Sequence, residues 1–164
     1  MKELKDISGI GQTGRPHIAK LLMNHGMVRS MPQAFDEYLK KDAKAYVARF
    51  AYSAEDAIGF ITGAGGIAVL AHPVQVDRTL NFLATLLPVL KSYGLEGIET
   101  YYPTQKKKMR KRIRKFAEEN GLLLTGGSDY HGDIRPGTRL AGGNNVFVPP
   151  ELLEKIKERL AAKA

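Results

Sequence analysis

Three short apolar runs, separated by segments with helical periodicity, constrain the fold of this chain more than any other feature. The first run covers Ile67 to Ala71, the second lies within residues 94–102, and the third opens at Leu122. The first run is continuous, which is typical of a strand buried on both faces of a parallel sheet. The order strand, helix, strand, helix, strand forms right-handed crossovers. The sequence therefore predicts an α/β fold with a parallel sheet.

The first fifty residues follow a different pattern. A helix is predicted from Pro16 to Gly26 and a second from Pro32 to about Lys41, and no segment here has the pattern of a strand. Residues 1–50 are therefore expected to form a small helical subdomain. Residues 51–164 would contain the three strands and the helices that cover them. Those helices are predicted at about residues 78–93, 104–120 and 150–160.

The absence of cysteine limits the metal chemistry open to this chain. Any metal must be bound by His, Asp or Glu, because none of the 164 residues is a cysteine. Oxygen and imidazole ligands favour Mn, Mg, Fe or Zn. The apolar runs are too short to span a bilayer, and the charged first residues do not resemble a secretory signal. We expect a soluble, cytoplasmic protein with no membrane partner.

The net charge of +8 arises from one segment. Lys and Arg number 25 against 17 Asp and Glu, and residues 106–115 alone hold eight cations and no acid, which accounts for the whole excess. Such a segment could bind an anionic partner such as RNA. However, Met109, Ile113 and Phe116 form a stripe at helical spacing. This stripe favours a helix that packs on the core and turns most of its cations to solvent.

Polar side chains follow the predicted strands. His72 comes directly after the first run, Glu99 lies near the end of the second, and Asp129 and His131 follow the third. The loops at the carboxyl ends of parallel strands converge, and side chains at i and i+2 of an extended segment point to the same side. Singly, such a His is often structural and such an Asp often caps a turn. Taken together, the three candidate ligands His72, Asp129 and His131 favour a metal site.

Four motifs, in this order along the chain, resemble the PHP (polymerase and histidinol phosphatase) superfamily. They are most similar to the branch of small phosphoesterases that act on nucleoside bisphosphates and short RNA. The motifs are Gly14-Arg15-Pro16-His17-Ile18-Ala19, Ala64-Gly65-Gly66-Ile67-Ala68-Val69-Leu70-Ala71-His72-Pro73, Gly97-Ile98-Glu99 and Thr125-Gly126-Gly127-Ser128-Asp129-Tyr130-His131-Gly132.

The resemblance implies a distorted (β/α)7 barrel with a cluster of metals at the strand ends and a small helical insertion. Residues 1–50 resemble the insertion, and residues 51–164 resemble the C-terminal half of the barrel. The family's N-terminal ligands, a His-x-His pair, an Asp-His pair and a bridging Glu, have no counterpart before Gly14. We therefore expect a C-terminal portion that needs the N-terminal half of the barrel as its partner. Core surface exposed in this way would favour homo-oligomers.

The same resemblance assigns roles to five residues. His72, Asp129 and His131 match metal ligands, with Mn as the expected cation, and Arg15 and His17 match a pair that faces the substrate phosphate. His17, Asp129 and His131 are the residues implied in catalysis. Guanidinium binds phosphate in bidentate fashion, and an imidazole can donate a hydrogen bond or a proton. The structural alternative for Arg15 and His17 is a pair of solvated side chains at the start of a helix.

The function implied is that of a metal-dependent phosphoesterase, a hydrolase that cleaves phosphate esters of nucleotides or short RNA with a metal-activated water. The chain alone is expected to hold an incomplete site. One alternative within the same chemistry is a phosphomonoesterase of the histidinol-phosphatase type. Another is a non-catalytic fragment that binds nucleic acid or a protein partner.

Overall fold

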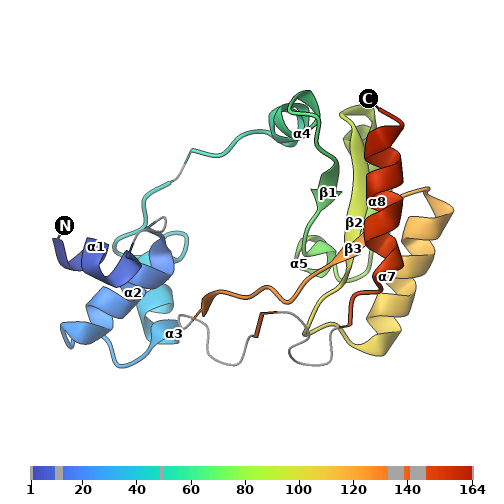
Figure 1. Ribbon diagram of the computed structural model, residues 1–164. Helices are drawn as coiled ribbons and strands as arrows, with labels where there is room; N and C mark the ends of the chain where they lie inside the picture. Colours follow the sequence, from blue (N-terminus) through green and yellow to red (C-terminus); the bar gives the residue numbers. More distant parts are fainter. Residues whose placement is uncertain (1, 10–12, 49, 133–138, 141–146, 164) are drawn as a thin grey trace. The chain divides into compact units, whose positions relative to one another are not determined.

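The chain folds into two compact units, Met1–Ala51 and Tyr52–Ala164, each with its own core. The computed structural model describes residues 2–9, 13–48, 50–132, 139–140 and 147–163. The first unit is helical (Figure 1). Its elements are α1 (Lys2–Ser8), α2 (Arg15–Asn24), α3 (Met31–Ala34) and the π-helix η1 (Phe35–Leu39). Its described residues include no strand.

The core of the first unit is small. Ala19, Val28, Ala34 and Leu39 are buried, with Ile18, Leu22 and other apolar side chains packed against them. Helix α2 matches the first predicted helix, whereas the second predicted helix is divided between α3 and η1. Ser30 caps α3 by accepting a hydrogen bond from the N–H of Gln33 at 3.3 Å. The assignment of this unit to an insertion stays a prediction.

The second unit contains a three-stranded parallel sheet, which confirms the predicted α/β class (Figure 1). The strand order is β1 (Ala68–Leu70), β2 (Leu95–Tyr101) and β3 (Leu123–Gly126), with β2 in the middle. The helices are α4 (Ala54–Gly63), α5 (Pro73–Val76), α6 (Asn81–Ser92), α7 (Lys107–Glu119) and α8 (Glu151–Ala161). Helix α7 packs on β2 and β3, and α8 packs on β3. None of the described helices is long and apolar enough to cross a membrane.

The burial of the first strand differs from the prediction. Only Ala68 of β1 is buried, and Val69 and Leu70 are partly exposed, so the expectation of a strand buried on both faces is wrong for the described structure. Val69 and Leu70 are partly exposed because β1 lies at an edge of the described sheet and pairs with β2 alone. The central strand β2 has the most buried residues of the three.

Two helices begin later than predicted. Helix α6 starts at Asn81 rather than 78, because the Asp77 carboxylate accepts hydrogen bonds from the N–H groups of Phe82 and Leu83 and so holds the preceding residues in a turn. Helix α7 starts at Lys107 rather than 104. Residues 77–80 are therefore a loop between α5 and α6, and residues 102–106 are a loop between β2 and α7.

The core of the second unit lies between the sheet and its helices. Leu83, Leu87 and Leu90 of α6 and Ile98 of β2 are buried there, together with Ile113 of α7. Met109 and Phe116 pack against this core, which confirms the predicted stripe on the basic helix. Burial of each large apolar side chain stabilises the fold by about 1.5–3 kcal/mol. This packing fixes the strand ends and the loops that leave them.

Candidate metal centre at the carboxyl ends of the strands

Polar side chains from three parallel strands meet at one end of the sheet. His72 follows β1 by two residues, Glu99 lies in β2, and Asp129 and His131 lie in the segment after β3. Because the strands are parallel, their carboxyl ends share one edge of the sheet. The geometry of the group is a chain of contacts that runs from Glu99 to His72, then to Asp129 and finally to His131.

The first contact fixes His72. The Oε2 atom of Glu99 accepts a hydrogen bond from the backbone N–H of His72 at 2.8 Å. The same oxygen lies 3.1 Å from His72 Nδ1, but the angles do not make a hydrogen bond, and the buried Nδ1 atom has none with the residues described. We therefore assign the positioning of His72 to the backbone hydrogen bond. The Glu99 side chain is only 13% exposed, so this contact is shielded from water.

The second contact joins two strands. His72 Nε2 lies 3.9 Å from Asp129 Oδ1. The other oxygen of this carboxylate, Oδ2, accepts a hydrogen bond from the Tyr102 hydroxyl at 2.8 Å. The Tyr102 ring also meets the His72 ring edge-on, with centroids 4.9 Å apart and an interplanar angle of 78°. Tyr102 thus positions both residues of the pair.

The third contact sets the proton on His131. Its Nδ1 atom lies 2.7 Å from the backbone carbonyl oxygen of Asp129 and 3.6 Å from Oδ1 of the same residue. A carbonyl oxygen can only accept, so Nδ1 is the donor in this hydrogen bond. In the neutral ring the lone pair is then on Nε2. His131 therefore presents Nε2 as its atom for a cation or a proton.

Two of these residues have unusual backbone conformations. His72 has a φ of 48° and Asp129 a φ of 50°, both in the left-handed region that L-residues rarely adopt. Such conformations cost of order 1 kcal/mol or more each and gather at functional sites. The surrounding structure therefore stabilises both residues in a backbone conformation that is unfavourable by itself.

The donor types fit a divalent cation, but the described arrangement brings them together in pairs. Among the described residues, no group of three or more His, Asp or Glu side chains lies close enough to hold a metal ion. His72 and Asp129 approach each other, and His131 is engaged with the backbone of Asp129. The predicted ligand set of His72, Asp129 and His131 stays a prediction.

The two residues expected at the substrate phosphate lie in the first unit. Arg15 donates a hydrogen bond to the carbonyl oxygen of Leu39 at 3.4 Å, and its guanidinium lies 6.0 Å from the ring centroid of Phe35. His17 Nδ1 accepts a hydrogen bond from the N–H of Gly14 at 2.9 Å. In its neutral form His17 therefore carries its proton on Nε2.

Comparisons with known proteins bear on this geometry. No family model matches the chain. It is 34% identical over 136 residues to a 3′,5′-nucleoside bisphosphate phosphatase of Chromobacterium violaceum. The aligned region covers 83% of this chain and 47% of the relative. It is 34% identical over 121 residues to a 5′-3′ exoribonuclease of Haemophilus influenzae, covering 74% of this chain and 44% of the relative. A solved structure of a candidate metal-dependent phosphoesterase from Bifidobacterium adolescentis aligns with a TM-score of 0.77 and 28% identity, over 96% of this chain and 55% of that one.

The predicted resemblance to the PHP superfamily is confirmed. The chain spans about half the length of the PHP relatives that it matches. The α/β fold is shared with the solved structure, and closure of the strands into a barrel stays a prediction.

Two residues of the candidate site lie outside the predicted ligand set. Glu99 ends a recognised motif but received no role, although a carboxylate in a mostly apolar strand was a usable signal. Tyr102 was missed, because no pattern in the sequence shows where the hydroxyl of a tyrosine after a strand will point. Both act through His72 and Asp129, so they are positioning residues.

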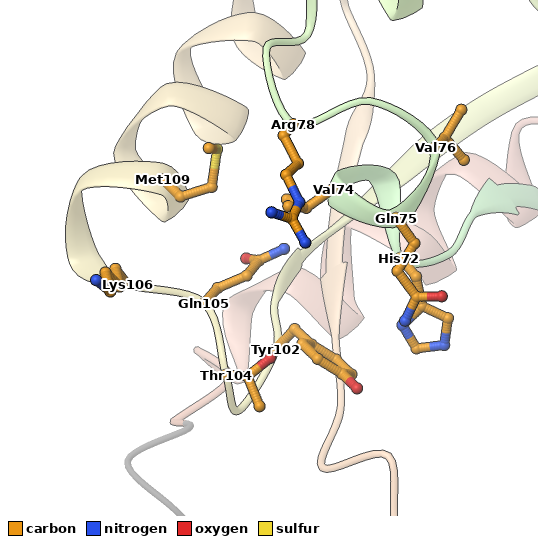
Figure 2. A pocket seen from close by; sticks show the side chains of 10 residues that line it. All are labelled: His72, Val74, Gln75, Val76, Arg78, Tyr102, Thr104, Gln105, Lys106 and Met109. Carbon is orange, nitrogen blue, oxygen red and sulfur yellow. The ribbon is translucent and has the colours of Figure 1, made fainter. Parts of the chain in front are cut away.

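A pocket of about 800 Å³ adjoins this group (Figure 2). His72 and Tyr102 form part of its wall. The other lining residues are Val74, Gln75, Val76, Arg78, Thr104, Gln105, Lys106 and Met109. Because α6 and α7 start later than predicted, Arg78 and residues 104–106 lie in loops at this wall rather than in helices.

Proposed function

We propose that this chain forms part of a divalent-metal phosphoesterase that hydrolyses phosphate esters of nucleotides or short RNA. One observation carries the proposal: His72 after β1 and Asp129 after β3 approach to 3.9 Å, and each is held by a separate supporting residue. Imidazole and carboxylate that converge from separate strands are typical of metal sites in parallel α/β folds. The names of the relatives support the reaction class.

The proposed ligands are His72, Asp129 and His131. The proposed cation is Mn²⁺, with Mg²⁺, Fe²⁺ or Zn²⁺ as alternatives, all of which accept oxygen or imidazole donors. A bound divalent cation would supply a water of lowered pKa and would neutralise charge on the phosphate. Around it, Glu99 holds the backbone of His72, and Tyr102 turns Oδ1 of Asp129 toward the imidazole.

The proposed role of the first unit is to bind the phosphate of the substrate. His17 would donate a hydrogen bond from Nε2, since its Nδ1 already accepts one from Gly14. Arg15 would bind phosphate oxygens with its guanidinium. His17, Asp129 and His131 are the proposed catalytic residues. A phosphorylated nucleotide or a short RNA is the proposed substrate, in line with the activities for which the two relatives are named.

We also propose that the site is completed by ligands from polypeptide outside this sequence. Three ligands give one weak site, whereas clustered metals need several anionic and imidazole groups. Exposed apolar side chains on the second unit, including Phe60 and Phe82 at 60% each and Leu153 at 55%, provide surface for such a partner or for a second copy of the chain. A cytoplasmic location stays a prediction.

The test is metal binding by the chain itself. Equilibrium dialysis with Mn²⁺ should show at least about tenfold weaker binding for His72→Ala and for Asp129→Ala. His25→Ala is a matched control, because His25 is an exposed imidazole that pairs with Glu3 in the first unit. Equal binding by wild type and both site variants would contradict the proposal.

A second measurement addresses the reaction. Release of phosphate from a nucleoside 3′,5′-bisphosphate is followed with the chain alone and with the chain mixed with the N-terminal half of a relative. Activity that requires both polypeptides, and that His72→Ala removes, is the expected result. Activity that survives in His72→Ala would show that the reaction does not depend on this site.

A further inference from the structure

The pocket beside His72 has the charge and polarity of an anion site. Arg78 and Lys106 line it, and its other lining residues include no carboxylate (Figure 2). In the part of the chain that the structure describes, neither cation forms an ion pair. Figure 2 shows the guanidinium of Arg78 directed into the pocket. Two cations without acidic partners in one concave site favour an anionic ligand.

The loop that carries Arg78 is fixed from both sides. Asp77 accepts hydrogen bonds from the Thr79 N–H and hydroxyl at 2.8 and 2.7 Å. Arg112 of α7 donates a hydrogen bond to the Thr79 carbonyl oxygen at 2.6 Å. An arginine whose loop is already ordered loses less conformational entropy when it binds an anion. The fold therefore orders the backbone on both sides of Arg78, while its side chain stays exposed.

Gln105, which also lines the pocket, has a side-chain oxygen that accepts no hydrogen bond from the described residues. The Oε1 atom of Gln105 is buried and has no hydrogen-bond partner among the described residues. Leaving a buried amide oxygen unpaired is unfavourable. A ligand that carries a hydroxyl group could satisfy it, whereas a fully ionised phosphate has no proton to donate. Apolar side chains of Val74 and Met109 complete the wall and suit the carbon skeleton of a sugar.

We propose that this pocket binds a phosphorylated ribose, with Arg78 and Lys106 on a phosphate other than the one that is cleaved and Gln105 on a sugar hydroxyl. The cleaved phosphate would lie next door, because His72 and Tyr102 belong both to the pocket wall and to the candidate metal centre. This assignment of the cleaved phosphate rests on the proposed function. The pocket would then select substrates that carry two phosphates, or a chain of them, over monophosphates.

The experiment measures binding without metal and without turnover. Adenosine 3′,5′-bisphosphate, adenosine 5′-monophosphate and inorganic phosphate are titrated by calorimetry into the wild-type chain and into Arg78→Gln. The matched control is Lys111→Gln, which removes one charge from an exposed position on α7 outside the pocket lining. Gln105→Leu tests the hydroxyl contact against the same nucleotide lacking its 2′-hydroxyl.

The expected result is bisphosphate binding that is about 10- to 100-fold weaker in Arg78→Gln and unchanged in Lys111→Gln, with a smaller loss for the monophosphate. Gln105→Leu should abolish the preference for the ribose over the deoxyribose ligand. The proposal is overturned if wild type binds no nucleotide, if it binds inorganic phosphate as tightly as the bisphosphate, or if the two charge variants weaken binding equally. Metal binding that fails while Arg78-dependent nucleotide binding persists would refute the proposed function and leave the pocket standing.

Discussion

The Tyr102 hydroxyl and the Asp129 carboxylate are joined by a 2.8 Å hydrogen bond that spans the segments after β2 and β3. Tyr102→Phe would keep the ring against His72 and remove the hydroxyl that donates to Asp129. We expect Mn²⁺ binding to weaken by about tenfold, since residues that orient metal ligands have effects of this size. The measurement is equilibrium dialysis, and Tyr93→Phe, a partly buried ring at the core, is the control. Equal metal affinity in Tyr102→Phe and wild type would show that the hydrogen bond does not matter for binding.

The close approach of β2 and β3 near the site can be tested with two adjacent glycines. A methyl group on Gly126 would overlap Tyr101, with the carbonyl oxygen of Tyr101 only 2.5 Å away, whereas one on Gly127 would meet nothing within 4 Å. Gly126→Ala should therefore destabilise the fold by about 1–3 kcal/mol. Gly127→Ala should change stability by less than about 0.5 kcal/mol. Urea denaturation measures both, and similar midpoints for the two variants would contradict the predicted overlap.

Asp77 should make stability depend on pH in acid. Hydrogen bonds from the Thr79 side chain, opposed by partial burial and aided by the N–H groups of Thr79, Leu83 and Phe82, lower the pKa of Asp77 from 3.8 to about 2. A carboxyl with a lowered pKa stabilises the fold above its unfolded pKa and loses that effect as the pH falls. The contribution should thus be complete above about pH 4 and decline toward pH 2.

The measurement for Asp77 is the difference in unfolding free energy between wild type and Asp77→Asn at several pH values. The difference should be largest near pH 6 and should shrink toward pH 2. Glu119→Gln, an exposed change on α7, should show no such trend. A difference for Asp77→Asn that stays constant down to pH 2 would refute the assignment.

The C-terminal helix should depend on one carboxylate of β2. Burial alone would raise the pKa of Glu96, but hydrogen bonds and charge from Lys163 and Arg159 lower it below 4.5. Glu96→Gln should loosen α8, so its amides should exchange faster with deuterium at neutral pH. In wild type the same loosening should appear as the pH falls through the lowered pKa. Glu154→Gln, which removes an exposed pairing within α8, is the control, and equal exchange in both variants would count against this role.

The basic segment 106–115 illustrates what a pattern in sequence can settle. Its apolar stripe placed Ile113 in the core, and this is where the structure has it. Two of the cations, Arg114 and Lys115, pair with Glu118 and Glu119 one turn later. Exposed pairs of this kind are weak, but they lower the net charge that the helix presents. The structure therefore gives the nucleic-acid-binding alternative no added support.

The positions of the strands could be predicted from the sequence, whereas the first residues of two helices, α6 and α7, could not. Periodicity located all three strands, because apolar runs that end in glycine or polar residues have few other interpretations. The same periodicity continued through residue 78 and residues 104–106, which in the structure are loops. The Asp77 carboxylate holds the start of α6 at Asn81, and periodicity alone does not predict its hydrogen bonds to Phe82 and Leu83. Periodicity therefore does not predict the pocket, because Arg78 and residues 104–106 line it.

The sequence predicted which residues belong to the candidate site better than it predicted their conformations. Parallel strands bring their carboxyl ends together, so the approach of His72 to Asp129 follows from topology. The left-handed conformations of these two residues do not follow, because neither is a glycine and the chain around them decides φ. The direction of the Tyr102 hydroxyl depends in the same way on packing across two loops.

The strand order has a thermodynamic consequence. His72 extends from one outer strand of the described sheet and Asp129 follows the other, with β2 between them. A single ion bound by both would link the two outer strands. A ligand that binds only the folded form stabilises it by an amount that grows with the logarithm of the ligand concentration over its dissociation constant. Assembly of the sheet and capture of the ion would then be one coupled equilibrium, with each made more favourable by the other.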